Sequence, residues 1–395
     1  MRILILTPKI PFPPYRGDIL HIFNIAKTLA ERNHVDIITQ YTFNNQIAYV
    51  HELKKNKLNT YIVKQTLLSS IINLILAIFK KIPFQVAYFS SKKMSGLIKE
   101  RTSNYEYDLI YFHLIRSVQY FDDTINSNAI KISDFTDAVS LYIERYLRFL
   151  KNPLRKLFFS IELKRLKEYE INARKFKTIF VCSDADKTYL DKKLQDVDIQ
   201  ILRNGVEEKY FFPEKIVFQK HRIIFSGNMP YYPNKDAADY FAKQIFPLVL
   251  KKYPDSKFYI VGQNPPQKTK KLDSKNIIVT GFVEDIRREY LLSEVNVAPI
   301  RFGAGTLNKV IESLALGVPI IATKIVVDGL PTELRKYVFL ADSPNEFAEK
   351  ISYIFEHDEV RNDLMKECIE LVPKLLGWHP IIQQFEKYIE SKLNE

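Results

Sequence analysis

The stretch VNVAPIRFGAGTLNKVIESLALGVPIIAT, residues 295–323, has the composition of a strand, a glycine-containing loop, a helix and a second strand in succession. Residues 295–299 alternate like a strand that enters a core. Gly303 and Gly305 permit a tight turn with exposed backbone N–H groups, and Thr306 is the expected N-cap of the helix. The stretch therefore predicts one βαβ unit of a parallel sheet.

The helix of this unit is amphipathic by its spacing. Its apolar face is expected to pack on the sheet and consists of Leu307, Val310, Ile311, Leu314 and Ala315. The opposite, polar face holds Asn308, Lys309, Glu312 and Ser313. A helix start behind a glycine turn favours phosphate, Lys309 adds a cation, and Glu312 suits the vicinal hydroxyls of a ribose. These features indicate a bound nucleotide diphosphate; an ordinary βαβ unit with a solvated polar face is the alternative.

Length and composition predict a globular protein of two domains, since 395 residues exceed the usual size of one core. Cys182 and Cys368 are the only cysteines, which excludes a disulfide scaffold and favours a reducing compartment. The start MRILILTPK lacks the apolar region of a signal peptide. We therefore expect a cytoplasmic protein. The net charge of +12 indicates an anionic partner. The sequence contains no nucleic-acid-binding motif, so we do not expect nucleic acid to be that partner.

The apolar run at residues 67–79 is too short to span a bilayer. It contains Ser69, Ser70 and Asn73 and is followed by two lysines. Two interpretations remain open for it. The run forms either a buried helix or a helix that lies on the inner face of the cell membrane, as the basic flank favours.

The first half of the chain begins with a buried strand at 2–7, a proline-rich loop at 8–18 and a helix, followed by a strand at 35–39. This order is typical of a doubly wound parallel sheet, whose ligands bind beyond the carboxyl ends of the strands. Gly17 lies where the loop meets the helix. Further strands are predicted at 60–63, 108–112, 129–132, 178–181 and 198–202, and residues 139–175 predict one or two long helices.

Residues 203–219 are the predicted linker, and strand–helix alternation resumes after them. Strands are expected at 222–226, 257–261 and 277–280, and helices at 237–253, 286–292, 342–356, 359–376 and 381–393. Eight of the eleven glycines lie between Gly205 and Gly329, which indicates a series of loops near a ligand. The chain thus predicts two similar α/β halves that flank a cleft.

Several motifs, taken together, resemble the retaining family 4 group of GT-B glycosyltransferases, and within it the sugar transferases associated with bacterial exopolysaccharides. The resemblance covers almost the whole chain. It rests on PFPPYRGD at 11–18, RNGV at 203–206, FSGNMPYYPNKD at 225–236, YIVGQNP at 259–265, VTGFVEDIR at 279–287 and PIRFGAGTLNKVIE at 299–312.

The resemblance implies two Rossmann-like domains that face each other across a cleft. Residues 1–205 would bind the acceptor and residues 206–376 the nucleotide sugar, while the helix in residues 377–395 would cross back to the first domain. Lys309 would contact the diphosphate, Glu312 the ribose, Gly17 the pyrophosphate and His113 the donor sugar. His113, Lys309 and Glu312 are therefore the catalytic candidates. The full nucleotide-sugar set is Gly17, Gly227, Asn228, Arg301, Gly303, Gly305, Thr306, Asn308, Lys309 and Glu312.

Two positions depart from the pattern of the family. Many members carry a second acid eight residues before the one that matches Glu312, where this chain has Ala304. Many also carry an arginine and a lysine where this chain has residues 227–230, GNMP. Arg301 and Lys309 are the hypothetical sources of the replacement charge.

Asp134 and Asp137 follow a strand end and are acceptor-side candidates, although helix capping also explains Asp137. The acidic triplets at 184–186 and 196–198 match the metal-binding pattern of another glycosyltransferase fold, but such triplets are common. We expect no metal and no cofactor other than the donor, with positive groups and backbone N–H groups neutralising the diphosphate.

The resemblance implies a metal-independent enzyme of the hexosyltransferase type. It would move a sugar from a nucleoside diphosphate sugar to a glycan or lipid-linked acceptor in bacterial surface polysaccharide biosynthesis, with retention of configuration. Two other functions remain open. A nucleotide-sugar epimerase of similar fold would act on the donor alone, and a non-catalytic nucleotide-sugar-binding protein would bind without turnover.

Overall fold

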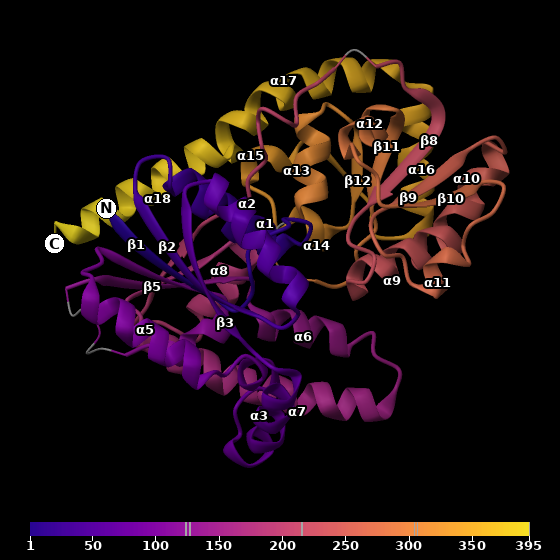
Figure 1. Cartoon of the computed structure of the whole chain (residues 1–395). Coiled ribbons are helices and arrows are strands. Elements are labelled where there is room, and N and C mark those ends of the chain that lie inside the picture. The colour runs from indigo at the N-terminus through magenta and orange to yellow at the C-terminus, as the bar shows by residue number, and fades with distance from the viewer. Residues whose placement is uncertain (123–124, 126–127, 215, 304, 306, 395) are drawn as a thin grey trace. The chain divides into compact units, whose positions relative to one another are not determined.

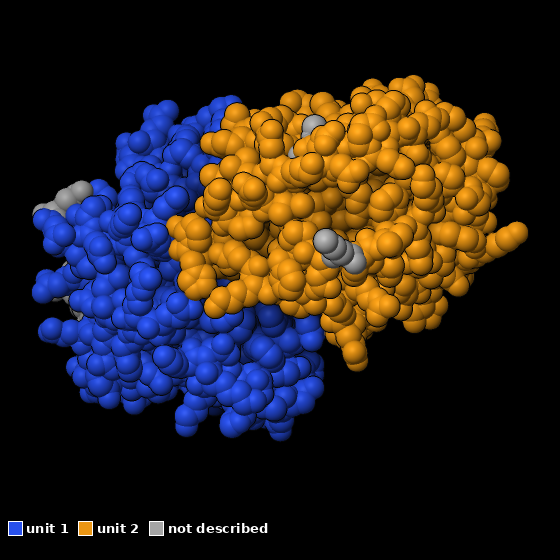
Figure 2. All heavy atoms as spheres, turned by 90° about the horizontal axis from the view of Figure 1, so that it is seen from above, with its two compact units in different colours: residues 1–203, 381–395 blue, residues 204–380 orange. Residues whose placement is uncertain are grey.

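The computed structural model describes residues 1–122, 125, 128–214, 216–303, 305 and 307–394 and consists of two compact units (Figures 1 and 2). Unit 1 contains residues 1–203 together with 381–395, and unit 2 contains residues 204–380. The chain therefore leaves unit 1 once and returns to it through its last helix.

Unit 1 is built on a seven-stranded sheet in the order β3-β2-β1-β4-β5-β6-β7, and every neighbouring pair is parallel. The strands are β1 (Arg2–Thr7), β2 (His34–Tyr41), β3 (Leu58–Lys64), β4 (Leu109–His113), β5 (Ile130–Thr136), β6 (Thr178–Val181) and β7 (Asp198–Ile201). The central strands are buried on both faces, which explains their continuous apolar runs.

The helices of unit 1 lie on both faces of this sheet (Figure 1). They are α1 (Gly17–Leu29), α2 (Ala48–Lys55), α3 (Leu67–Lys80), α4 (Phe84–Tyr88), α5 (Lys92–Asn104), α6 (Val139–Leu147), α7 (Pro153–Ile171) and α8 (Asp184–Asp191), with 3₁₀ turns at Asn44–Ile47, Ile115–Tyr120 and Asn172–Lys175. Ser183 caps α8 by accepting a hydrogen bond from the backbone N–H of Asp186. The long helical region predicted at 139–175 is confirmed as α6 and α7.

Unit 2 repeats the same winding with six parallel strands in the order β10-β9-β8-β11-β12-β13. They are β8 (Gln219–Ser226), β9 (Lys257–Val261), β10 (Ile277–Gly281), β11 (Ser293–Ala298), β12 (Ile320–Ala322) and β13 (Val338–Leu340). The sequence analysis missed β13, because three residues at a sheet edge carry too short a pattern to be recognised.

The helices of unit 2 are α9 (Tyr232–Tyr240), α10 (Phe246–Lys252), α11 (Gln267–Lys270), α12 (Ile286–Leu291), α13 (Asn308–Ala315), α14 (Lys324–Val327), α15 (Thr332–Arg335), α16 (Pro344–Glu356) and α17 (Asp358–Leu376). A π-helical turn at Phe241–Ile245 joins α9 to α10. The helix predicted at 237–253 is therefore confirmed in position but is interrupted, and Pro247 at the start of α10 fits the interruption.

The last helix, α18 (Trp378–Leu393), begins in unit 2 and continues into unit 1. At its start the indole of Trp378 lies against Gly205, where an added Cβ would come within 2.7 Å of the ring. Further along, Phe385 is 3% exposed and makes edge contacts with Tyr111 and Phe180 of unit 1. Tyr388 adds a hydrogen bond between its hydroxyl and that of Thr178.

We expect Phe385→Ala to lower the free energy of unfolding of unit 1 by about 3 kcal/mol, because it removes an aromatic side chain from a close-packed core. Thermal or denaturant unfolding followed by far-UV circular dichroism measures the change. Gln383→Ala, at an exposed position of the same helix, is the matched control and should leave stability unchanged. Equal stability of the two variants would show that α18 does not support unit 1.

Candidate functional site

The candidate site of unit 2 lies where the order of its strands reverses. β8 and β11 are neighbours at the middle of the sheet, and the connections from them run in opposite directions. Loops at the carboxyl ends of two such strands diverge and leave room for a ligand. Here β8 is followed by Gly227, and β11 is followed by the loop that leads to Lys309.

Lys309 is the central group of this site. It is 7% exposed, and its ammonium group lies 3.9 Å from the centre of the Phe225 ring. Its Nζ donates a hydrogen bond of 2.8 Å to the side-chain oxygen of Asn234. Burial lowers the pKa of Lys309 to about 7, although the nearby Glu312 acts to raise it. The charge is thus held in a place that disfavours it, which an anionic ligand would correct.

Glu312 lies one turn further along α13. The hydroxyl of Tyr290 donates a 3.1 Å hydrogen bond to its Oε2, and the same hydroxyl contacts the hydroxyl of Ser226. Burial raises the pKa of Glu312 to about 7, against the lowering effects of Tyr290 and Lys309. The carboxyl group is therefore positioned by a fixed hydroxyl and changes protonation state near neutral pH.

The sequence prediction for the polar face of α13 is wrong at two positions. Lys309 and Ser313 were expected opposite the sheet, but both are buried. Ser313 donates a hydrogen bond from its hydroxyl to the backbone oxygen of Val318 and so belongs to the core. Asn308 remains beside the loop, and its buried Oδ1 has no hydrogen-bond partner within the described part of the chain.

Gly227 and Asn228 follow β8 and lie beside Asn234 in the same site. A Cβ added at Gly227 would lie 2.7 Å from the side-chain nitrogen of Asn234 and 3.0 Å from Nζ of Lys309, so only glycine fits there. The backbone oxygen of Asn228 accepts a hydrogen bond from the side chain of Asn234. Asn234 therefore connects the β8 loop to Lys309, a role that the sequence analysis did not assign to it.

Arg301 forms an ion pair with Asp236. Its guanidinium donates two hydrogen bonds, of 2.9 and 2.7 Å, to the carboxylate of Asp236 and lies over the ring of Tyr240. Its predicted contact with a diphosphate stays a prediction, and it would require Asp236 to share the guanidinium. Gly303 follows it in the loop, and Gly305 has φ +74°, a left-handed conformation that favours glycine. Ala304 and Thr306 lie outside the described residues.

In unit 1 the corresponding strand ends are those of β1 and β4, and they hold His113. Its Nδ1 lies 2.9 Å from the hydroxyl of Thr7, and its Nε2 is buried without a hydrogen-bond partner among the residues described. Burial lowers the pKa of His113 to about 4. The ring is therefore neutral at pH 7 and has one nitrogen free to accept or donate a hydrogen bond.

Asp134 is fully buried and lies inside β5, beside His113 of β4, and not after the strand end as predicted. Its carboxylate faces Nε2 of His21 at 2.9 Å and accepts hydrogen bonds from the hydroxyl of Tyr111 and the backbone N–H of Thr136. Burial acts to raise its pKa, but the charge and hydrogen bond of His21 prevail and lower it. Its acceptor role stays a prediction, while its contacts are those of a group that fixes the strand end.

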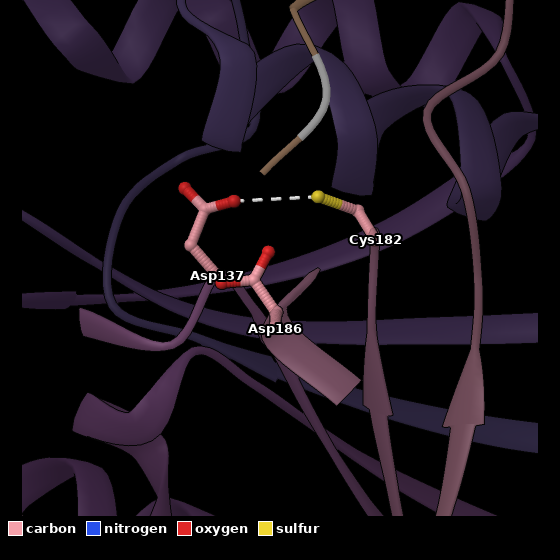
Figure 3. A group of neighbouring side chains, drawn as sticks. All are labelled: Asp137, Cys182 and Asp186. Atoms are coloured by element: carbon pink, nitrogen blue, oxygen red, sulfur yellow. Dashed lines mark hydrogen bonds between the residues drawn. The ribbon is translucent and has the colours of Figure 1, made fainter. Parts of the chain in front are cut away.

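Asp137, Cys182 and Asp186 come together at the ends of β5 and β6 (Figure 3). Cys182 donates a hydrogen bond from Sγ to Asp137, while Asp186 accepts bonds from Ser183 and from the backbone of Ala138. Burial, and then repulsion by Asp186, raise the pKa of Asp137 to about 7. One atom from each residue lies within 4.8 Å of the others, so the group has the spacing of metal ligands. Asp186 is nevertheless engaged as a cap of the local backbone.

A group of cations near Gly17 escaped the sequence analysis. The ammonium of Lys9 and the guanidinium of Arg116 both lie against the ring of Phe89, and Arg16 pairs with Asp18 at 3.0 Å. Burial, with repulsion from Arg16, lowers the pKa of Lys9 to about 8. Nε of Arg116 is buried and finds no hydrogen-bond acceptor in the part of the chain described. Arg116 lies far from Lys9 in sequence, so no local pattern joins them.

Comparison with known proteins matches part of unit 2 to a family model. Residues 220–357 match the family model described as glycosyl transferases group 1. The chain carries a glycosyl transferases group 1 domain. This domain contains the switch point of unit 2, with Gly227, Lys309 and Glu312. An uncharacterised 44.6 kDa protein from a cps region of Klebsiella pneumoniae is 21% identical over 363 residues, which cover 89% of this chain and 90% of that protein.

Solved structures resemble the chain over its whole length. Sucrose-phosphate synthase of Thermosynechococcus elongatus has a TM-score of 0.71 at 15% identity, with 100% of this chain and 99% of that chain covered. HepE of Anabaena, solved with UDP and glucose, has a TM-score of 0.70 at 14% identity over 99% and 100%. A Staphylococcus aureus TarM variant, solved with UDP, α-GlcNAc-glycerol and fondaparinux, has a TM-score of 0.71 at 13% identity over 98% and 99%. The fold is therefore GT-B, as predicted.

We expect Lys309→Met to raise the free energy of unfolding at pH 7 by about 2 kcal/mol, because it removes a charge that burial disfavours. The folded state binds fewer protons at Lys309 than the unfolded state does between pH 7 and 10.5. The gain should therefore be largest near and below pH 7 and fade as pH rises toward 10.5.

Unfolding curves at several pH values measure this difference. Lys251→Met, at an exposed lysine of unit 2, is the control and should show no such pH dependence. A Lys309→Met protein that is less stable than the original at pH 7 would contradict the prediction.

Proposed function

We propose that this protein is a glycosyltransferase that moves a sugar from a nucleoside diphosphate sugar to a glycan or lipid-linked acceptor. The observation that carries the proposal is the buried ammonium of Lys309 beside Glu312, at the switch point of a group 1 domain. Its only described hydrogen-bond partner is the neutral side chain of Asn234. An unneutralised cation at this place suits a diphosphate, and the adjacent carboxylate suits ribose hydroxyls.

In this proposal unit 2 binds the donor. The backbone around Gly227 approaches the phosphates where only glycine fits beside Lys309, and the free Oδ1 of Asn308 contacts the nucleotide sugar. Arg301, Gly303 and Gly305 complete the donor contacts. Two similar structures were solved with UDP, which supports a nucleoside diphosphate as the leaving group without fixing its base for this chain.

Unit 1 binds the acceptor in this proposal. The cations Lys9, Arg16 and Arg116 repel one another and are balanced by Asp18 alone among the groups that act on Lys9. Such a cluster is complementary to an anionic acceptor, for example one whose sugar is joined to a lipid through phosphate. Asp137 is the acceptor-side acid that changes protonation state near pH 7.

For the reaction we propose retention of anomeric configuration. The bond between the anomeric carbon and the diphosphate oxygen breaks, and the acceptor oxygen bonds to the same face of the sugar while its proton passes to the departing diphosphate. Lys309 stabilises the charge that develops on the leaving group. His113, neutral at pH 7, uses its free Nε2 to hydrogen-bond the donor sugar. The reaction requires no metal and no further cofactor.

The place of this reaction is surface polysaccharide biosynthesis at the inner face of the cell membrane. The name of the Klebsiella pneumoniae relative, which refers to a cps region, supports this assignment. A nucleotide-sugar epimerase and a non-catalytic nucleotide-sugar-binding protein are the competing functions. The epimerase would consume donor without acceptor, and the binding protein would never release nucleoside diphosphate.

We expect purified protein to release nucleoside diphosphate from one member of a panel of UDP-, GDP- and dTDP-sugars, at a rate that rises when membrane lipid extract supplies the acceptor. Lys309→Met should lower the rate about a hundredfold or more, because the leaving group loses its stabilising charge. Glu312→Gln should raise KM for the donor, and Lys251→Met should change neither constant.

Tight donor binding without release would favour the binding protein, and conversion of donor without acceptor would favour the epimerase. An inverted linkage in the product would contradict retention. Activity that excess chelator abolishes would contradict metal independence.

Gly17 provides a separate test of the donor and acceptor contacts. A Cβ added there meets no atom within 4 Å, so Gly17→Ala should fold with unchanged stability. We nevertheless expect turnover to fall about tenfold or more, because the glycine would be needed for close approach of the substrate phosphates. Gly96→Ala, at another helical glycine with open space around it, is the matched control. Unchanged turnover in Gly17→Ala would show that no ligand approaches this position.

A further inference from the structure

The helix α3 has its polar and apolar faces reversed relative to an ordinary surface helix. Ser70 and Asn73 face the protein, where they donate hydrogen bonds to the backbone oxygens of Tyr88 and Ser90. Large apolar side chains face outward instead, each between 46 and 78% exposed: Leu67, Leu68, Ile71, Ile72, Ile75, Leu76, Ile78 and Phe79. The interpretation of residues 67–79 as a buried helix is therefore wrong.

The first half of α7 extends this apolar face. Leu154, Leu157, Phe158 and Ile161 are between 43 and 78% exposed. Helix α4 links the two helices, because it packs against α3 and the ring of its Phe84 stacks on Phe158 of α7 at 5.3 Å. Together these twelve exposed side chains form what we call the α3–α7 face.

Polar contacts hold the two helices together without using the outward side chains. Arg165 donates hydrogen bonds to the backbone oxygens of Ala77, Ile78 and Ile82 at the end of α3. Glu162 accepts hydrogen bonds from the backbone N–H groups of Phe84 and Gln85. The apolar face is thus fixed in position and is not needed to anchor α3.

The two sequence segments that carry this face hold charges of one sign. Residues 53–99 contain no acid and nine lysines, namely Lys54, Lys55, Lys57, Lys64, Lys80, Lys81, Lys92, Lys93 and Lys99. Residues 145–161 contain no acid and five basic residues, namely Arg145, Arg148, Lys151, Arg155 and Lys156. Lys80 and Lys81 end α3, and Arg155 and Lys156 lie among the exposed apolar residues of α7.

We propose that the α3–α7 face docks on the surface of a bilayer that contains anionic lipids. Its leucine, isoleucine and phenylalanine side chains enter the boundary between headgroups and acyl chains, and the flanking lysines and arginines contact lipid phosphates. None of the helices in the described part of the chain combines the length and hydropathy needed to cross a bilayer, so α3 lies along the surface. A second copy of the chain fits less well, because two such faces would bring positive charges together.

The test is flotation of the full-length protein with vesicles, in the absence of donor and acceptor. We expect binding to vesicles of phosphatidylcholine with about one third phosphatidylglycerol, and about tenfold weaker binding to phosphatidylcholine alone. Lys80→Gln/Lys81→Gln should reduce the difference between the two vesicle types, and added salt should do the same.

The apolar contribution is tested with Leu68→Gln/Phe79→Gln in α3 and Leu154→Gln/Leu157→Gln in α7. Each should lower partitioning into anionic vesicles about tenfold or more. Val217→Gln is the matched control, since Val217 is 90% exposed in unit 2 and lies outside the face. Circular dichroism verifies that each variant is folded.

Failure of the original protein to bind anionic vesicles, or equal binding by the glutamine variants, would overturn the proposal. A dimer in light scattering that the same variants dissociate would assign the face to a second copy instead. Because nucleoside diphosphate release can be followed in detergent without vesicles, loss of docking and loss of the proposed transferase activity are distinguishable.

Discussion

The ammonium group of Lys309 is removed from water and paired only with a neutral amide among the described residues, and the centre of unit 2 is arranged around it. β8 supplies the ring of Phe225 and the bare backbone of Gly227, and α9 supplies Asn234. A buried cation without a counter-ion is costly, so such a group persists where function requires it. Among the described residues, the partly buried carboxyl group of Glu312 is the negative charge that acts on Lys309. Unit 2 can therefore accept a further anionic group beside this lysine.

Unit 1 has the same order in its first six strands, but its buried polar groups are hydrogen-bonded to one another. Asp134 is saturated by His21, Tyr111 and the backbone, and Thr7 fixes one nitrogen of His113. Thr136 and Leu114, at the ends of β5 and β4, have positive φ values of 60° and 64°, a conformation that costs free energy in residues other than glycine. These hydrogen bonds hold the strand ends around Nε2 of His113, a buried atom that has no hydrogen-bond partner among the described residues.

One surface helix of unit 1, α3, exposes its apolar face and turns its polar face toward the protein. An ordinary surface helix buries an apolar stripe and exposes polar groups, whereas α3 turns Ser70 and Asn73 toward the protein and exposes leucine and isoleucine. Backbone oxygens satisfy the inward polar groups, so the reversal leaves no unpaired polar side chain there. The apolar area left in water is the thermodynamic reason to expect a partner for this face.

The sequence by itself determined the parallel winding of both units, because apolar runs, glycine turns and amphipathic helices are local patterns with distinct periods. It also singled out Lys309 and Glu312 beside a glycine loop. Only the tertiary structure decided that Lys309 is buried, that Asn234 and Phe225 hold it, that Arg301 is paired with Asp236, and that α3 faces outward. These properties depend on contacts between side chains that are distant in sequence. The burial and the pKa of a group follow from those contacts, so no local sequence pattern predicts them.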